Sequence, residues 1–390
     1  MIHLAWLFAA SLASLLVLAV AAIFFYQAIR SIWGLRSPAP LAPRQDKTFG
    51  VLVPAHNEEG VLGPLMASLA QIDYPRERLK ILFVADHCTD ATVAEIRAGG
   101  FDCLDRQSGA RGKTASLAEG IAQLRAQYGE QLDAVAFFDA DNLVDPQFFQ
   151  QAAAGLHEGH EVLQGRVGVH NWQSTLFSRL NYMNAVVENR MEELARSQAG
   201  LSCNLRGHGM VFRMDVLQAL HWQSDTFVED QEMLVRLVCS GRRVHWLEHA
   251  RAASVLPQTA KEAAAQRRRW AGGRSAIMGR SIRSLWQRVQ ETGDRAALHL
   301  MIDFFLPSHA VQLSLLFVSI MVAAGVCGLA SWQFLLALAL LPAYLLYFVI
   351  GNLLSGVPAR TFLDILWAPA FIAWRTWIYL TSLGGAKRWR

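Results

Sequence analysis

The sequence has few cysteines, and none of them stands in the spacing of a metal site. Its 390 residues include 5 cysteines, and no two of these form a Cys-x-x-Cys pair. This absence excludes the common zinc-site patterns. An odd number of scattered thiols is typical of a reducing cytosol; the five are Cys88, Cys103, Cys203, Cys239 and Cys327.

A strong net charge and a phosphate-binding P-loop are also missing. The net charge of +4 is too small to indicate a nucleic-acid partner. The stretch QSGARGKT at residues 107–114 looks like a P-loop, but that pattern requires a glycine where Gln107 stands. We therefore do not expect a P-loop nucleoside triphosphatase. The sequence also contains no internal repeat and no low-complexity tract.

Apolar residues are plentiful, and the excess lies at the two ends of the chain. The hydrophobic fraction is 53%, which is high for a soluble protein. Leu4 to Ile29 is an uncharged apolar run that is about long enough to cross a bilayer. A signal peptide is the alternative, but the run lacks a basic n-region and a clear cleavage site. We expect a retained transmembrane helix, and the basic residues Arg30, Arg36 and Arg44 after it predict a cytoplasmic domain next.

Three more apolar stretches lie near the C-terminus, at Phe304 to Ala330, Trp332 to Ile350 and Phe362 to Leu380. The first two have the length and composition of membrane spans. The third contains Asp364, Arg375 and three tryptophans, which favour the membrane interface. Three crossings would also place the basic tail KRWR outside, against the positive-inside rule. We therefore expect the last stretch to be interfacial or re-entrant.

Basic residues cluster just before these stretches. From Arg267 to Arg288 they recur with Trp270, Ile282 and Trp286 between them. This pattern favours an amphipathic segment on an anionic inner leaflet, and an ordinary solvated helix face is the alternative.

Between the apolar ends, short strand and helix patterns alternate after a Pro-rich linker at residues 37–43. This alternation predicts a parallel sheet with helices on both faces. The predicted strands are 49–55, 79–86, 101–106 and 134–140, and the predicted helices are 58–72, 89–100 and 114–129.

Polar side chains follow the predicted strands at the points where these end. Ligands bind at the carboxyl ends of strands in such sheets. Asp139 and Asp141, one residue apart after a buried strand, could hold a divalent cation that bridges to substrate phosphates, although a solvated turn is the alternative. The other residues at this edge are His56, Asn57, Glu58, Asp86, Arg111, Gly112 and Lys113.

The motif order PAHNE, ADHCTD, RGK, DAD, GHGMVFR, VEDQEM and QRRRW resembles that of the family 2 glycosyltransferases. Within them the chain is similar to the membrane-bound synthases of bacterial polysaccharides, such as cellulose, hyaluronan, chitin and poly-N-acetylglucosamine synthases. The resemblance covers roughly Thr48 to Arg274. It implies a GT-A fold, which is a Rossmann-like α/β domain with a mainly parallel sheet, a UDP-sugar donor and an inverting reaction.

The resemblance also implies roles for individual residues. Asp230 matches the general base, and Asp139 and Asp141 match the DxD motif that holds Mg²⁺ or Mn²⁺. The residues that match nucleotide-sugar contacts are Glu58, Asp86, Lys113, Asp139, Gln266 and Arg269. The residues that match acceptor contacts are Trp270 of the QxxRW motif and Gly207, His208 and Gly209.

Each of these residues also has an ordinary structural alternative. Glu58 and Asp230 open helices, where acidic residues are common, and Asp86 could cap one. Arg269 could contact lipid, and the Gly207–Gly209 loop could be a plain tight turn. Cys88 stands where serine is common in the family, and the chain has fewer membrane stretches than members that secrete a polymer.

This reading divides the chain into four parts. They are a transmembrane helix and linker at 1–36, a GT-A domain at 37–265, the QxxRW and interfacial region at 266–303, and transmembrane or interfacial helices at 304–390. The predicted location is a bacterial inner membrane, as a multi-pass protein with a cytoplasmic catalytic domain.

Three functions compete on the sequence alone. The first is extension of a glycan in exopolysaccharide synthesis, from UDP-glucose or UDP-N-acetylglucosamine. The second is transfer of one or a few sugars to a membrane lipid acceptor. The third is a catalytically silent membrane scaffold or nucleotide-sensing module on the same fold, which would not need Asp230 as a base. Membrane lipids are expected partners, and a secretion subunit or a second copy of the chain is a further candidate.

Overall fold

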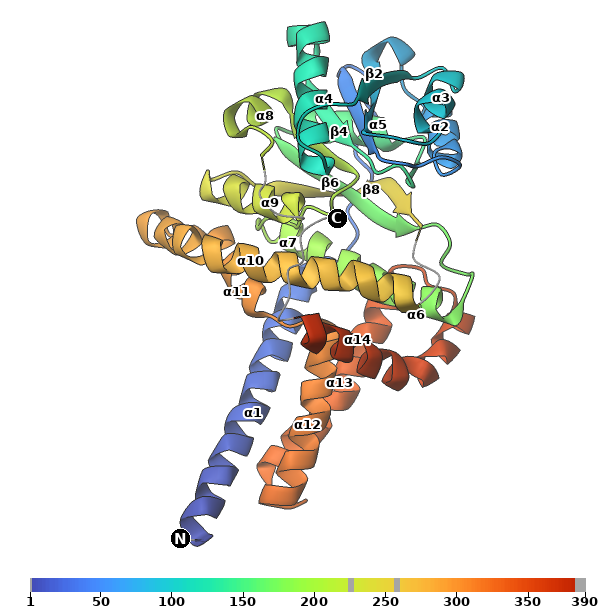
Figure 1. Cartoon of the computed structure of the whole chain (residues 1–390). Helices are drawn as coiled ribbons and strands as arrows, with labels where there is room; N and C mark the ends of the chain where they lie inside the picture. The colour runs from blue at the N-terminus through green and yellow to red at the C-terminus, as the bar shows by residue number, and fades with distance from the viewer. Residues whose placement is uncertain (1, 224–227, 256–259, 383–390) are drawn as a thin grey trace.

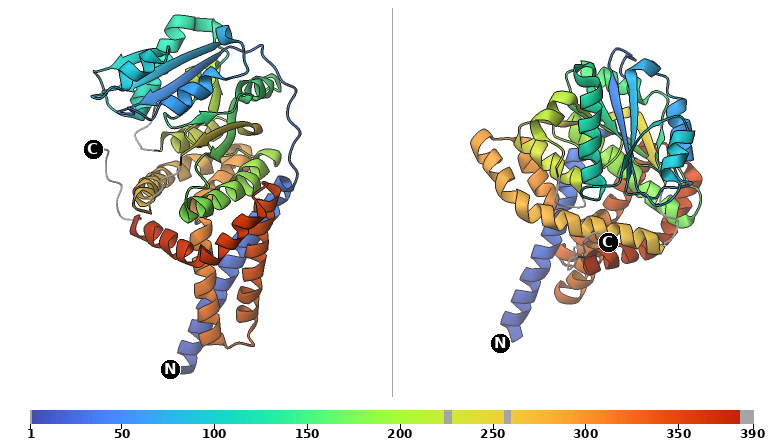
Figure 2. Two further views of the ribbon diagram at one scale, coloured as in Figure 1. Left: turned by 90° about the vertical axis from the view of Figure 1, so that its right-hand side faces the viewer. Right: turned by 45° about the horizontal axis from the view of Figure 1, so that its top comes forward.

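A computed structural model describes residues 2–223, 228–255 and 260–382, with the backbone alone at 2, 269–272 and 274–276. A sheet domain lies at one end of the molecule and long helices lead away from it at the other (Figures 1 and 2). The long helix α10 crosses between the two parts. The candidate site is therefore bounded by a sheet on one side and by helices near the membrane on the other.

The sheet has 8 strands in the order β3-β2-β1-β4-β7-β6-β8-β5. Strands β1, β2, β3 and β4 pair in parallel, as the alternating pattern predicts. β6 also pairs in parallel with β8, whereas β7 runs antiparallel to both β4 and β6. The strand bounds are β1 Phe49–Ala55, β2 Leu79–Asp86, β3 Asp102–Arg106, β4 Ala134–Phe137, β5 Leu143–Val144, β6 Val162–Val169, β7 Met210–Arg213 and β8 Val244–Ser254.

Helices cover both faces of this sheet. Along β1, Val51 and Val53 pack with helices α2, α3 and α5, whereas Leu52 between them packs with α4 on the opposite face. Successive side chains of a strand point to opposite faces, so a strand covered on both must be apolar throughout. The α-helices of the sheet domain are α2 Gly63–Ala70, α3 Thr92–Ala98, α4 Lys113–Tyr128, α5 Phe148–His157, α6 Leu176–Val187, α7 Ala195–Gln198, α8 Met214–Leu220 and α9 Glu229–Cys239.

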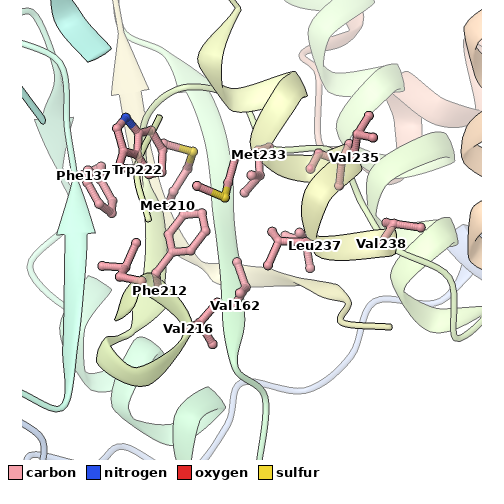
Figure 3. Close-up of a cluster of buried hydrophobic side chains, with 14 of the residues drawn as sticks. Phe137, Val162, Met210, Phe212, Val216, Trp222, Met233, Val235, Leu237 and Val238 are labelled. Carbon is pink, nitrogen blue, oxygen red and sulfur yellow. The ribbon is translucent and has the colours of Figure 1, made fainter. Parts of the chain in front are cut away.

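One cluster of apolar side chains fixes α9 against the sheet (Figure 3). The Phe137 ring at the end of β4 stacks on Trp222, with their centroids 4.9 Å apart. Met233 and Leu237 of α9 are buried in the same cluster. This packing places the start of α9 beside the carboxyl end of β4, and both ends carry acidic residues.

Two of the predicted elements differ from the structure in ways that affect the site. β4 ends at Phe137, so Asp139 lies in the following loop and not in a strand that reaches residue 140. Helix α2 begins at Gly63, later than the predicted 58, because the backbone turns first at Asn57 (φ 54°) and Gly60 (φ 77°). Positive φ values interrupt a helix. Both changes lengthen the loops that border the site.

Three helices are long and apolar enough to cross a membrane, in the segments His3–Leu35, His309–Cys327 and Trp332–Leu354. They correspond to α1 (Ile2–Ser31), α12 (His309–Cys327) and α13 (Trp332–Leu354). α1 packs against the other two, and its Phe24 ring lies 4.5 Å from the ring of Tyr344. The predicted span at 304–330 starts later, because residues 306–308 separate α12 from α11 (Arg295–Phe305). The chain is thus a multi-pass membrane protein.

The last predicted apolar stretch forms a 3₁₀ helix at Ala359–Trp367 and helix α14 at Ala368–Ser382. Among the described residues, α14 is not one of the candidate spans, and it lies across the ends of the long helices (Figure 2). An interfacial position for α14 stays a prediction. The KRWR tail at 387–390 lies outside the described residues.

Helix α10 (Ala260–Thr292) carries the basic run that the sequence predicts to be amphipathic. Ile277 and Leu285 are buried against the core of the sheet domain, whereas Trp286 is exposed. Contact of the exposed face with lipid stays a prediction.

Buried ion pairs fasten the membrane helices to the sheet domain. Arg30 of α1 donates to Asp303 of α11 (3.1 Å), and Arg196 of α7 lies 2.6 Å from the same carboxylate. Arg196 also pairs with Glu193 (3.1 Å) in a π-helical turn at Glu188–Leu194. His309, at the start of α12, lies 2.7 Å from Glu192 in that turn. The ion pairs of Arg30 and Arg196 with Asp303 therefore join segments that are distant in the sequence.

Candidate active site

A tight turn after β4 presents the two aspartates of the DAD motif. Asn142, which is fully buried, accepts a hydrogen bond from the Asp139 amide (2.9 Å) and donates to Asp141 Oδ1 (3.0 Å). Asparagine commonly bonds to nearby backbone in turns, and this residue was not among the sequence-predicted site residues. Its position directly after the DAD motif was the signal in the sequence that could have identified it.

Lys113, the first residue of α4, links three segments at this edge. Its ammonium donates to Asp139 Oδ1 (2.5 Å) and to the Gly207 carbonyl (3.2 Å), and it lies 3.4 Å from Glu229 Oε1. Burial opposes the charge on Lys113, but the carboxylates of Asp139 and Glu229 raise its pKa above the ordinary value. The amine is therefore a permanent positive charge beside the acidic turn.

Asp230 stands in the first turn of α9, directly across from this lysine. Burial and the neighbouring charge of Glu229 raise the pKa of Asp230 to about 7. Gly207 lies against it, since a Cβ at that glycine would be 3.6 Å from Asp230 Oδ2 and 3.7 Å from Lys113 Nζ. A carboxylate with a pKa near neutrality is suited to accept a proton.

The acidic side chains at this edge repel one another in the absence of a cation. Burial and the charge of Asp139 raise the pKa of Asp141. Burial, Asp141 and Asp139 raise the pKa of Glu58, which places Glu58 near the pair. The described residues contain no group of three or more His, Cys, Asp or Glu that could hold a metal alone. Two carboxylates do suit a hard cation that completes its coordination with phosphate oxygens and water.

Asp86 has partners for both of its carboxylate oxygens within the protein. Oδ1 accepts a hydrogen bond from Arg106 and lies 2.8 Å from His87 Nδ1, and Oδ2 accepts from the Gly112 amide at 2.7 Å. Arg106 donates in turn to the Ala110 carbonyl (2.6 Å). Asp86 thus fastens the loop before α4 to the end of β2. Its predicted contact with a nucleobase stays a prediction, and Arg106 was not among the predicted residues.

The GHG loop before β7 has glycines where the backbone requires them. Gly207 and Gly209 have φ values of 79° and 63°, which residues other than glycine rarely adopt. His208 between them is buried, and burial lowers its pKa to about 4, so the ring is neutral. Its Nδ1 lies 3.9 Å from Asp139 Oδ2. The loop is a constrained turn and also a wall of the site.

One cavity of about 1330 Å³ brings most of these residues together. It continues from the acidic turn to Gln312 of α12 and Arg375 of α14, near the membrane boundary. The predicted site residues that line it are Lys113, Asp139, Asp141, Gly207, His208, Asp230 and Gln266. Glu58, Asp86 and Gly209 do not line it, and the side chains of Arg269 and Trp270 lie outside the described residues.

Comparison with known proteins places these motifs in context. The family model described as "Glycosyltransferase like family 2" matches residues 43–273. The chain is 28% identical over 261 residues to glucomannan 4-beta-mannosyltransferase 7 of Arabidopsis thaliana, covering 61% of this chain and 46% of that protein. It is 23% identical over 301 residues to the probable glycosyltransferase YdaM of Bacillus subtilis, covering 72% and 70%. The chain thus spans about half the length of the plant relative.

A solved structure has a similar arrangement of elements. The mannosyltransferase PcManGT from Pyrobaculum calidifontis, in complex with GDP-Man and Mn²⁺, matches with a TM-score of 0.59 and 17% identity. The match covers 88% of this chain and 98% of that one. At this identity the likeness shows a common fold.

Proposed function

The chain belongs to glycosyltransferase-like family 2, and we propose that it transfers a sugar from a nucleotide-sugar donor to an acceptor hydroxyl with inversion. One observation carries this proposal. A cationic amine, two neighbouring carboxylates and a carboxylate with a pKa near neutrality line a single cavity. A silent scaffold has no need of the last of these.

The donor end is the edge that carries Lys113, Asp139 and Asp141. Lys113 holds a positive charge within reach of a diphosphate, and the two aspartates would hold Mg²⁺ or Mn²⁺. When bound, such a cation neutralises charge on the departing diphosphate. Gln266 lines the same cavity, and Arg269 follows it by about one helical turn on α10. Leaving-group contact by this arginine rests on the QxxRW motif alone.

Asp230 is the base in this mechanism. It takes the proton from the acceptor hydroxyl as the oxygen attacks the anomeric carbon from the face opposite the diphosphate. A single displacement of this kind inverts the anomeric centre, and base assistance is typically worth about 10²–10⁴ in rate. Gly207 leaves space beside the carboxylate, because any side chain there would approach Asp230 and Lys113.

The proposed donor is a UDP-sugar, with GDP-mannose as a second candidate. The preference for uridine rests on the motif match of Asp86. Both oxygens of that carboxylate already accept hydrogen bonds from protein groups, so GDP-mannose stays a candidate. The plant relative is named a mannosyltransferase, and the solved structure holds GDP-Man. The proposed acceptor is a growing glycan. A membrane lipid acceptor is the second candidate, because the cavity reaches the ends of α12 and α14.

We place the sheet domain on the cytoplasmic side of a bacterial inner membrane. Arg36 and Arg44 follow the first span, and the positive-inside rule sets this orientation.

A donor panel tests the proposed function. The full chain in detergent would receive UDP-glucose, UDP-N-acetylglucosamine or GDP-mannose with Mg²⁺ or Mn²⁺, and mass spectrometry would size the products. A ladder of products supports glycan extension, and a single lipid-linked adduct supports the second candidate. No turnover of any donor would favour the scaffold.

Chelation should stop the reaction. We expect EDTA to abolish transfer and added Mn²⁺ or Mg²⁺ to restore it, because Asp139 and Asp141 otherwise leave the donor end negatively charged. Asp141→Asn should raise the metal concentration that gives half of the maximal rate, because it removes a charged ligand. The exposed Asp102→Asn should behave as wild type. Full activity in EDTA would remove the metal from the proposal.

Transfer should also depend on pH through Asp230. The side chain acts as a base only when ionised, so the initial rate should fall below pH about 7. The fall should approach about tenfold per pH unit. Glu229→Gln removes a charge that raises this pKa, so its profile should shift to lower pH. A profile that stays flat in both proteins would contradict the assignment.

A further inference from the structure

Two arginines line the cavity in addition to the residues of the acidic turn. Arg267 of α10 and Arg375 of α14 both line it. The Arg267 guanidinium donates to Asn181 (2.5 Å), and that of Arg375 lies 5.7 Å from the centroid of the Phe371 ring. Among the residues that the structure describes, neither guanidinium forms an ion pair with a carboxylate.

The two positive charges repel each other. Burial and the charge of Arg375 lower the pKa of Arg267 to about 9, and burial lowers the pKa of Arg375. Both groups are still protonated at neutral pH. The Glu188 carboxylate raises the pKa of both arginines. It already forms an ion pair with Arg206 (3.3 Å) and accepts a hydrogen bond from Asn184 (2.6 Å). Two partly buried cations without their own carboxylate form a suitable site for an anion with several oxygens.

Part of the cavity lining is apolar. Phe305, Leu306, Ile378 and Tyr379 line the same cavity. Next to Arg375, the Trp374 ring lies 4.9 Å from that of Phe177. α14 lies across the ends of the membrane helices (Figures 1 and 2). An anion bound here would therefore have apolar side chains and the bilayer next to it.

The donor diphosphate is bound elsewhere in the proposed mechanism. Its end of the cavity is at Lys113 and Asp139. The Arg206–Glu188 ion pair lines the same cavity, and the Glu188 carboxylate raises the pKa values of Arg267 and Arg375. The two arginines have no role in donor binding in that mechanism, so they are candidates for binding a second anion.

We propose that Arg267 and Arg375 bind the phosphate of a lipid-linked acceptor, whose hydroxyl-bearing end extends toward Asp230. This inference rests on the proposed function, because it names the class of acceptor. It holds for a single sugar and for a longer glycan, since either can be carried on a lipid phosphate.

Binding of three small probes to the full chain in detergent tests this site. Geranyl phosphate carries both chain and phosphate, geraniol carries the chain alone, and inorganic phosphate carries the anion alone. Intrinsic tryptophan fluorescence can report binding, because Trp374 adjoins Arg375. We expect wild type to bind geranyl phosphate about tenfold or more tightly than either other probe.

Four variants complete the experiment. Arg267→Gln and Arg375→Gln should each weaken geranyl phosphate binding by about tenfold or more, because each removes a charged hydrogen-bond donor. Arg375→Lys keeps the charge, so it should bind geranyl phosphate more tightly than Arg375→Gln does. It also replaces Arg375→Gln in the comparison if that variant does not fold. Arg283→Gln changes an exposed arginine of the same helix and should bind as wild type.

The outcomes separate this inference from the proposed function. Equal binding by wild type and by the arginine variants would overturn it, as would equal binding of inorganic and geranyl phosphate. A parallel loss of UDP or GDP binding would assign the arginines to the donor and overturn it as well. Arginine-dependent binding of geranyl phosphate without turnover of any nucleotide sugar would support the site and remove the proposed function instead.

Discussion

Asp230→Asn should lower sugar transfer by about 10²–10⁴-fold. Asparagine has nearly the same shape but cannot accept the acceptor proton, so the loss should appear in the rate of transfer. Asp230 lies across from the donor end, so affinity for the nucleoside diphosphate should change by no more than about twofold. Initial rates with saturating donor and calorimetric titration of the nucleotide measure the two quantities.

The control for this variant is Asp102→Asn, which changes an exposed aspartate on the edge strand β3. It should leave both transfer and nucleotide affinity unchanged. Wild-type rates in Asp230→Asn would show that another group accepts the proton. A joint loss of transfer and nucleotide affinity would place Asp230 at the donor instead.

Arg196→Met should destabilise the protein by about 3–5 kcal/mol, the typical cost of removing one partner of a buried ion pair. Arg196 is almost fully buried and lies within 3.2 Å of carboxylate oxygens of Glu192, Glu193 and Asp303. Burial alone would raise the pKa of Asp303, but the Arg196 charge holds it below the ordinary value. Methionine has no charge, so the buried carboxylates would lose the cation that neutralises them.

Thermal unfolding of the purified protein in detergent measures this effect, together with the fraction that elutes as a single species. Arg125→Met, on the exposed surface of α4, should change the free energy of unfolding by less than about 0.5 kcal/mol. Equal melting temperatures for the two variants would mean that water enters the cluster and replaces the lost charge.

The sequence predicts the elements with a regular pattern and misses those that depend on distant contacts. Strands β1 and β2 have the predicted bounds, because an apolar run covered on both faces stands out between polar residues. The short strand β7 and the π-helical turn at Glu188–Leu194 were not predicted. Their residues acquire this structure from the sheet and the membrane helices that pack on them.

The same distinction holds within the site. Asp139, Lys113 and Asp230 were predicted from motif order, and the structure brings them to one cavity. The role of Arg106 was not predictable, because its partner Asp86 lies 20 residues earlier and only the sheet brings the two together. Arg267 was expected to belong to a helix face on the membrane surface, but it lines the cavity.

The buried ion pairs around Asp303 have a consequence for acceptor choice. They join α1 and α11 to α7 of the sheet domain, so we expect the height of Asp230 above the bilayer to change little between turnovers. A membrane-anchored acceptor must then span that height with its own head group. Head groups that are too short leave the hydroxyl below the carboxylate, so the enzyme would select acceptors by length before it distinguishes their chemistry.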